Sequence, residues 1–143
     1  MAKETALRRM VYVGIGLVIA EAAFSAFVTI PRMAMHPEVV GLGSVRSYSY
    51  FVIVQLIVAA VLLAFVILIR HDLRKIRVIL IISGIGVILL SFMMFTGAVF
   101  YLDEYGFYDV ANLLSICIVA NLIAGILFIG VAIKLGRSTT DLS

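Results

Sequence analysis

Four residues near the start of the chain have the types and spacing of a polar path across a membrane. Glu21, Ser25 and Thr29 follow one another at intervals of four residues, and Arg32 lies three residues further on. On an α-helix this spacing places the four side chains on one face. The Glu21 carboxyl group would take up and release a proton or bind a cation, and the two hydroxyl groups would lead outward to Arg32.

The same strip has a structural interpretation, in which Glu21 hydrogen-bonds a polar group on a neighbouring helix or an adjacent subunit. Gln55 and Asn121 are the polar residues at a matching depth in later apolar segments. A charged carboxylate at the centre of a membrane helix costs about 2.5 to 3.5 kcal/mol on insertion scales. Both interpretations therefore predict that Glu21 faces protein or water rather than lipid, and the sequence leaves both open.

The elements that carry these residues are predicted from composition. Hydrophobic residues make up 64% of the chain and charged residues 13%, against about 45 to 50% and about 25% in soluble proteins. Each of four apolar stretches exceeds the roughly 20 residues that a helix needs to span the hydrocarbon core: residues 10–30, 48–69, 78–102 and 110–135. Because no stretch alternates as barrel strands do, we expect an all-α integral membrane protein, a bundle of four transmembrane helices forming a single domain over residues 1–143.

The charge of the connecting segments predicts the orientation, because Lys and Arg favour the cytoplasmic side. Arg32 and Arg46 fall on one side of the predicted membrane. The other nine of the eleven basic residues fall on the opposite side: Lys3, Arg8, Arg9, Arg70, Arg74, Lys75, Arg77, Lys134 and Arg137. We therefore expect a multi-pass protein of the cell membrane with both termini in the cytoplasm.

The start of the chain has a second interpretation, because basic residues followed by an apolar segment also resemble a signal peptide. The apolar stretch continues to Ile30, which favours a spanning helix. Residues 31–47 are then an outer loop, and we expect Pro31 to end the first helix by removing a hydrogen-bond donor. Tyr48 and Tyr50 follow this loop, and we expect both in the aromatic belt at the membrane interface.

Small residues recur at four-residue spacing in two of the apolar segments. In the first, Gly16 pairs with Ala20 and Ala22 with Ala26. In the last, a face of small and polar groups contains Cys117, Asn121 and Gly125, with Ala120 and Ala124 beside it. Such faces allow helix backbones to approach closely in lipid. We expect the first and last of the four helices to pack together through them.

The histidines and the loop acids do not form a pattern typical of a cofactor or metal site. His36 and His71 fall on opposite sides of the predicted membrane, so they cannot be paired axial ligands of one haem. His36 joins Arg32 as a candidate residue of the outer face, but its neighbours do not match a metal-ligand spacing. The sequence therefore predicts no cofactor and no metal. The basic pI of about 9.2 follows from the membrane orientation and does not indicate nucleic-acid binding.

The string from Tyr12 to Glu21 resembles the first helix of the small multidrug-resistance transporters, four-helix membrane proteins with an acid in that helix. The resemblance covers about a dozen residues. The chain departs from the family in its length, its extended first outer loop, its lack of tryptophan and its strong charge bias. For these reasons we do not assign the chain to that family.

The function that we expect from the sequence is that of a small non-catalytic subunit or assembly partner in a larger membrane complex, either energy-converting or translocating. Its partners would be the lipid bilayer and other membrane subunits or further copies of itself. The alternative is a homo-oligomeric transporter or channel with Glu21 as its proton-coupled or cation-binding site. Soluble-enzyme motifs are absent, which favours a chain without catalytic activity. A third class, an integral enzyme acting on lipid or quinone, has only the basic inner turn in its favour.

Overall fold

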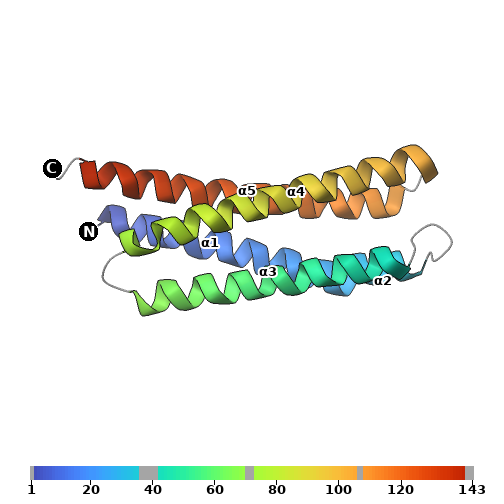
Figure 1. The fold of residues 1–143 in the computed structure, drawn as a ribbon, viewed down its shortest axis with the longest axis horizontal. Helices are drawn as coiled ribbons and strands as arrows, with labels where there is room; N and C mark the ends of the chain where they lie inside the picture. Colours follow the sequence, from blue (N-terminus) through green and yellow to red (C-terminus); the bar gives the residue numbers. More distant parts are fainter. Residues whose placement is uncertain (1, 36–41, 70–72, 106–107, 141–143) are drawn as a thin grey trace.

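The chain folds into long helices that run side by side (Figure 1). The computed structural model describes residues 2–35, 42–69, 73–105 and 108–140. Its elements in chain order are α1 (Ala2–Phe24), the π-helical turn η1 (Ser25–Thr29), α2 (Ile30–Ala34), α3 (Leu42–Leu68), the 3-10 turn η2 (Leu73–Ile76), α4 (Arg77–Tyr105) and α5 (Tyr108–Thr140).

Four segments of the described chain are long and apolar enough to cross a membrane. They are Thr5–Ala34, Val45–Leu68, Leu73–Thr96 and Ala111–Arg137. The predicted all-helical class with four helices of spanning length is thereby confirmed. Each helix extends beyond the apolar stretch predicted for it at one end or both, because polar residues there continue the same backbone hydrogen bonding; only α3 ends a residue early, at Leu68.

The first spanning segment does not end at Pro31, and this expectation was wrong. α1, η1 and α2 follow one another without a break, and the helix continues to Ala34. In a regular helix the proline ring would clash with the carbonyl group four residues earlier. Here the amide of Ile30 bonds to the carbonyl of Ser25, five residues back, which widens the turn just before the proline. Pro31 then lies in the first turn of α2, where the missing donor is tolerated.

The connection after the first segment is consequently shorter than the predicted loop over residues 31–47. Helix α2 occupies its beginning, and α3 begins at Leu42. Residues 36–41 lie outside the described part of the chain. Most of the described residues between positions 31 and 47 therefore belong to the ends of α2 and α3 and not to a loop.

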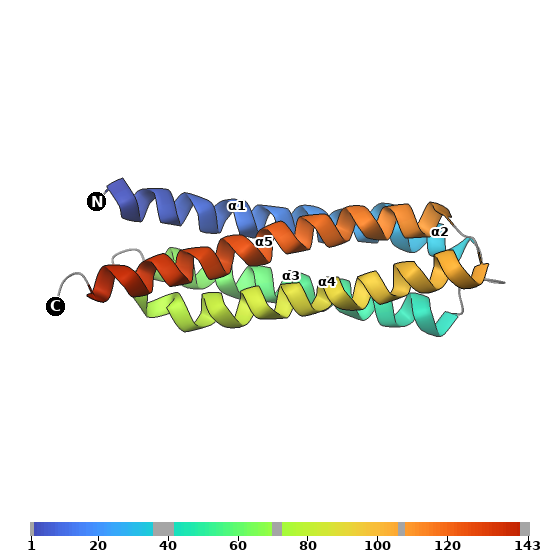
Figure 2. The ribbon, with the colours of Figure 1, turned by 90° about the horizontal axis from the view of Figure 1, so that it is seen from above.

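Consecutive long helices run antiparallel to one another (Figures 1 and 2), and α1 packs more extensively on α5 than on α3. α4 packs chiefly on α5, and α1 contacts both α5 and α3. α3 and α4 contact each other least among neighbouring helices. Both termini lie at the same end of the bundle (Figure 1). The side of the membrane on which they lie stays a prediction.

Helices α4 and α5 pack extensively and approach closely at a pair of glycines. A Cβ atom added to Gly84 would lie 3.0 Å from the carbonyl oxygen of Gly125, and one added to Gly125 would lie 3.0 Å from that of Gly84. The small face of α5 therefore packs on α4. α1 meets α5 differently, with Phe128 lying against Gly14, while Gly16 is exposed with nothing within 4 Å of its added Cβ. The expected packing of Gly16 against the last helix was wrong.

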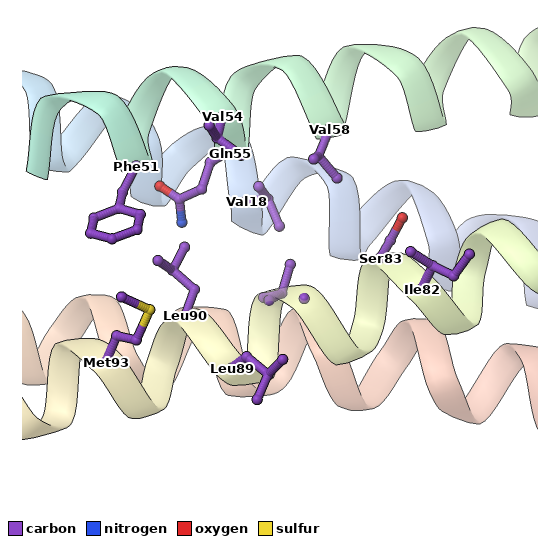
Figure 3. Close-up of a pocket in the computed structure, with 12 residues that line it drawn as sticks. Val18, Phe51, Val54, Gln55, Val58, Ile82, Ser83, Leu89, Leu90 and Met93 are labelled. Atoms are coloured by element: carbon purple, nitrogen blue, oxygen red, sulfur yellow. The ribbon is translucent and has the colours of Figure 1, made fainter. Parts of the chain in front are cut away.

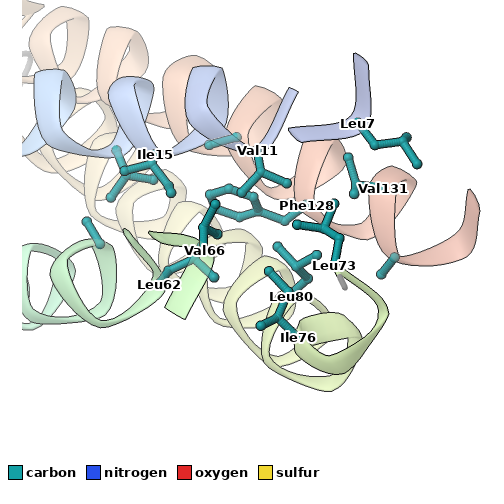
Figure 4. Close-up of a cluster of buried hydrophobic side chains, with 14 of the residues drawn as sticks. Leu7, Val11, Ile15, Leu62, Val66, Leu73, Ile76, Leu80, Phe128 and Val131 are labelled. Atoms are coloured by element: carbon teal, nitrogen blue, oxygen red, sulfur yellow. The ribbon is translucent and has the colours of Figure 1, made fainter. Parts of the chain in front are cut away.

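The interior contains two clusters of buried apolar side chains, one toward each end of the bundle. The cluster at the end with the termini is centred on Phe128, with Val11, Leu62 and Val66 around it (Figure 4). The other cluster contains Ala22, Met33, Tyr48, Val52, Met94, Ala111, Leu114 and Cys117. A layer of buried polar side chains lies where the two clusters adjoin, and it contains the predicted acid.

Candidate functional site

Glu21 is buried within its own bundle, and both of its carboxyl oxygens accept hydrogen bonds. Its side chain is only 3% exposed. The hydroxyl of Ser25, one turn later on the same helix, donates to Oε1 at 2.7 Å. The amide Nε2 of Gln55 on α3 donates to Oε2 at 2.5 Å. The acid therefore ties the first spanning segment to α3 and does not need an adjacent subunit to satisfy it.

The Gln55 amide extends the cluster to the last helix. Its Nε2 also donates to Oδ1 of Asn121 at 3.3 Å, and Nδ2 of Asn121 lies 3.7 Å from the sulfur of Met94 on α4. Gln55 is 3% exposed and Asn121 is completely buried. Polar or polarisable groups from all four spanning helices thus meet in one layer.

A second branch of the cluster leads from Ser25 toward the α2 end of the bundle. The Ser25 hydroxyl lies 3.0 Å from the hydroxyl of Tyr48 and 3.5 Å from the sulfur of Cys117. Tyr48 is 7% exposed, whereas Tyr50 is 61% exposed. The expectation that Tyr48 belongs to the aromatic belt was wrong, because Tyr48 lies on the same face of α3 as the buried Gln55, seven residues later. Tyr50 lies two residues further along the helix and faces outward.

We call this set of six side chains the central polar cluster: Glu21, Ser25, Tyr48, Gln55, Cys117 and Asn121. Sequence analysis did not single out Tyr48 or Cys117 as members. Cys117 precedes Asn121 by four residues, so the helical period was a usable signal for it. Tyr48 lies seven residues before Gln55, a spacing that places both side chains on one face of a helix, so the helical period was a usable signal for Tyr48 as well.

The remaining predicted residues lie outside the central polar cluster. Thr29 is completely buried, but its hydroxyl makes no hydrogen bond within the described part of the chain. The π-helical turn rotates Thr29 away from the four-residue spacing that would align it with Ser25. Arg32 is exposed on α2. His36 lies outside the described residues.

The electrostatics of the site depend mainly on the charge of Glu21. Both donors to its carboxyl group, Ser25 and Gln55, are neutral. Burying a carboxylate without a cation costs roughly several kcal/mol of hydration free energy, and hydrogen bonds from neutral donors recover only part of that cost. A proton or a small cation would remove that penalty. Among the described residues, no group of three or more His, Cys, Asp and Glu side chains is placed to hold a metal ion.

Glu21 also lies in the wall of a hollow of about 180 Å³ between α1 and α5. Cys117 lies in the same wall, with Leu17, Ala20, Phe24, Ile116 and Ala120. On the other side of the acid, Gln55 lines a larger cavity between α3 and α4. The central polar cluster therefore separates two hollows that lie on opposite sides of the bundle.

Comparisons with known proteins do not add to this picture, since no protein-family model, curated protein or solved structure matches the chain.

Proposed function

We propose that this chain is a small membrane transporter in which Glu21 binds and releases a proton or a monovalent cation. The observation that carries the proposal is the environment of Glu21: a carboxyl group buried at the centre of its own bundle with neutral donors on both oxygens. Intramembrane acids of this kind commonly mark ion or proton pathways.

The hydrogen bonds around Glu21 supply a way for its charge to change the site. When the acid is ionised, Gln55 donates through Nε2, and its Oε1 is buried without a partner among the described residues. When the acid carries a proton, it becomes a donor itself and needs an acceptor. A half-turn of the Gln55 amide would present Oε1 to the protonated acid. Proton uptake would therefore turn the amide that lines the α3–α4 cavity.

Access to Glu21 is available through polar atoms and through the bundle wall. The Ser25 and Tyr48 hydroxyls are 3.0 Å apart and form a chain of exchangeable protons toward the α2 end. The hollow between α1 and α5 reaches Glu21 from the side. The hydroxyl chain is the proton route that we propose, because the hollow is lined mainly by apolar side chains and lies on the flank of the bundle.

The test is flux into sealed vesicles that contain the purified protein, under an imposed pH or sodium gradient. Glu21→Gln keeps an acceptor oxygen and similar volume, so we expect the protein to fold and flux to fall to the level of empty vesicles. Asn112→Leu, on the exposed face of α5, is the matched control and should leave flux unchanged. Normal flux through Glu21→Gln would overturn the proposal and leave Glu21 as a structural residue.

A second candidate function is that of a non-catalytic subunit in a larger membrane complex. One observation favours it: Gly16, Ala20 and Ala23 form an exposed small-residue face on α1, and such faces commonly pack on other membrane helices. The native mass in mild detergent discriminates the two proposals. Several different chains at fixed stoichiometry would support the subunit, whereas one kind of chain would support the transporter.

A further inference from the structure

A cavity of about 360 Å³ lies between α3 and α4 (Figure 3). Its volume falls in the range of small-molecule sites, about 300 to 1,000 Å³. Most of the side chains in its wall are apolar, among them Phe51, Val54, Leu89 and Met93. The cavity exists because α3 and α4 contact each other least among the neighbouring helices.

The cavity opens sideways, toward the space that lipid occupies around a membrane bundle. Three apolar side chains at its rim are largely exposed: Val54 at 55%, Ile82 at 65% and Leu89 at 57%. None of the lining residues carries a charge. A molecule dissolved in the bilayer would therefore enter between α3 and α4 without crossing the polar ends of the bundle.

Two polar side chains interrupt the apolar wall, and each has hydrogen-bonding capacity left over. Figure 3 shows Gln55 extending from α3 toward Leu90 with its amide nitrogen foremost, while its Oε1 is buried, has no partner among the described residues and is closed off from the cavity. The Ser83 hydroxyl on α4 also makes no hydrogen bond within the described chain. Serines inside membrane helices usually bond the carbonyl four residues earlier. The serines at positions 49, 91 and 115 do so here.

We propose that this cavity binds a neutral, single-chain amphiphile from the bilayer that carries a hydroxyl or amide N–H group. The alkyl chain would lie along the apolar wall, and the head group would hydrogen-bond the Ser83 hydroxyl, which Figure 3 shows directed toward α3. A charged head group does not fit, because burying it without a partner is costly. A plain acyl tail of a phospholipid would fill the space but leave the Ser83 hydroxyl, on a residue that is only 8% exposed, unpartnered, against the strong tendency of buried polar groups to be bonded. The proposal does not depend on ion coupling at Glu21.

The test uses a long-chain alcohol with a photoreactive diazirine in its alkyl chain, added to the full chain in phosphatidylcholine bilayers. After irradiation, labelled residues are identified by mass spectrometry, and we expect labels on Phe51, Val54, Leu89 and Met93. Decanol should compete for labelling more effectively than decane by roughly 2- to 10-fold, the value of one net hydrogen bond. Ser83→Ala should reduce this preference without changing competition by decane.

Two matched glycine variants test the place of binding. A Cβ added to Gly86, in the cavity wall, or to Gly130, on α5, meets nothing within 4 Å. Both Gly86→Leu and Gly130→Leu should therefore fold, which circular dichroism checks. We expect Gly86→Leu to fill the cavity and lower labelling at least about 10-fold, as tight occlusion of a site does, and Gly130→Leu to keep it.

Each alternative result would overturn the proposal. Equal labelling of Gly86→Leu and the unaltered chain would show that the alcohol binds the outer surface and not the cavity. Equal competition by decanol and decane would show that the space holds lipid tails without polar recognition. Because neither readout uses ion flux, failure here is distinct from failure of the transport proposal.

Discussion

The hydrogen bond between Gln55 and Glu21 is the contact whose strength can be most directly predicted and measured. Gln55→Leu replaces the amide with an apolar side chain of similar size, so the steric cost is small. The change removes the 2.5 Å donor to Oε2 of Glu21 and the 3.3 Å donor to Asn121. The carboxyl group then has only Ser25 as a donor, at a position that is 3% exposed.

The expected magnitude depends on the charge of Glu21. Hydrogen bonds to charged groups contribute about 1.5 to 3 kcal/mol, whereas neutral interhelical bonds in membranes average about 0.6 and reach about 1.7 kcal/mol. If Glu21 is ionised, Gln55→Leu should destabilise the bundle by about 2 to 3 kcal/mol. Removing both partners leaves no unpaired carboxylate, so Glu21→Leu/Gln55→Leu should cost less than the sum of the single variants.

The assay is reversible unfolding in mixed micelles, driven by increasing SDS and followed by circular dichroism. The four chains of the double-mutant cycle are compared, and Asn112→Leu, an exposed position on α5, serves as the control for adding leucine. A coupling energy above about 1.7 kcal/mol, the upper range for neutral pairs, would indicate an ionised Glu21. Additivity of Glu21→Leu and Gln55→Leu within about 0.5 kcal/mol would refute the hydrogen bond as described.

Three other outcomes follow from the packing. Gly125→Ala should destabilise the bundle by about 1 to 3 kcal/mol in the same SDS assay, because the added Cβ would lie 3.0 Å from the Gly84 carbonyl oxygen. The control is Gly86→Ala, which should be neutral or stabilising because its added Cβ meets nothing within 4 Å. A stable Gly125→Ala would contradict the close α4–α5 approach. Phe128→Ala should cost about 3 to 5 kcal/mol, since the ring is 1% exposed at the centre of its cluster, and a loss below 1 kcal/mol would show that α1 and α3 do not enclose it. Cys117 is the single cysteine of the chain and is completely buried. It should react with a membrane-permeant maleimide, detected by mass spectrometry, only after unfolding in SDS. Rapid reaction in the folded state would show that the thiol is exposed.

The helical class was predictable because lipid leaves few choices for a backbone. A chain with four apolar stretches of spanning length must hydrogen-bond its amides within each segment, and the structure contains a helix at each place. The meeting of Glu21 with Gln55 and Asn121 was anticipated from depth alone, since polar side chains at one level in adjacent helices are the available partners. Depth could not show which helix faces which.

The positions of Pro31, Tyr48 and Gly16 could not be obtained in this way. Pro31 normally ends a helix, and only the widened turn at η1 allows the helix to pass it. The inward direction of Tyr48 depends on how α3 is rotated about its axis. Gly16 has the same local pattern as a packed glycine, yet α5 lies against Gly14 instead.

The sequence by itself determined the number of helices, their approximate extents and the presence of one acid at mid-depth, because these follow from hydropathy and from the cost of unsatisfied groups in lipid. The tertiary structure decided which helices are neighbours, that Glu21 is satisfied inside its own bundle, and that α3 and α4 leave a cavity beside Gln55. These features depend on helix rotation and on backbone approach at glycines such as Gly84 and Gly125. Van der Waals packing sets both, and packing is a property of pairs of surfaces that no single segment encodes.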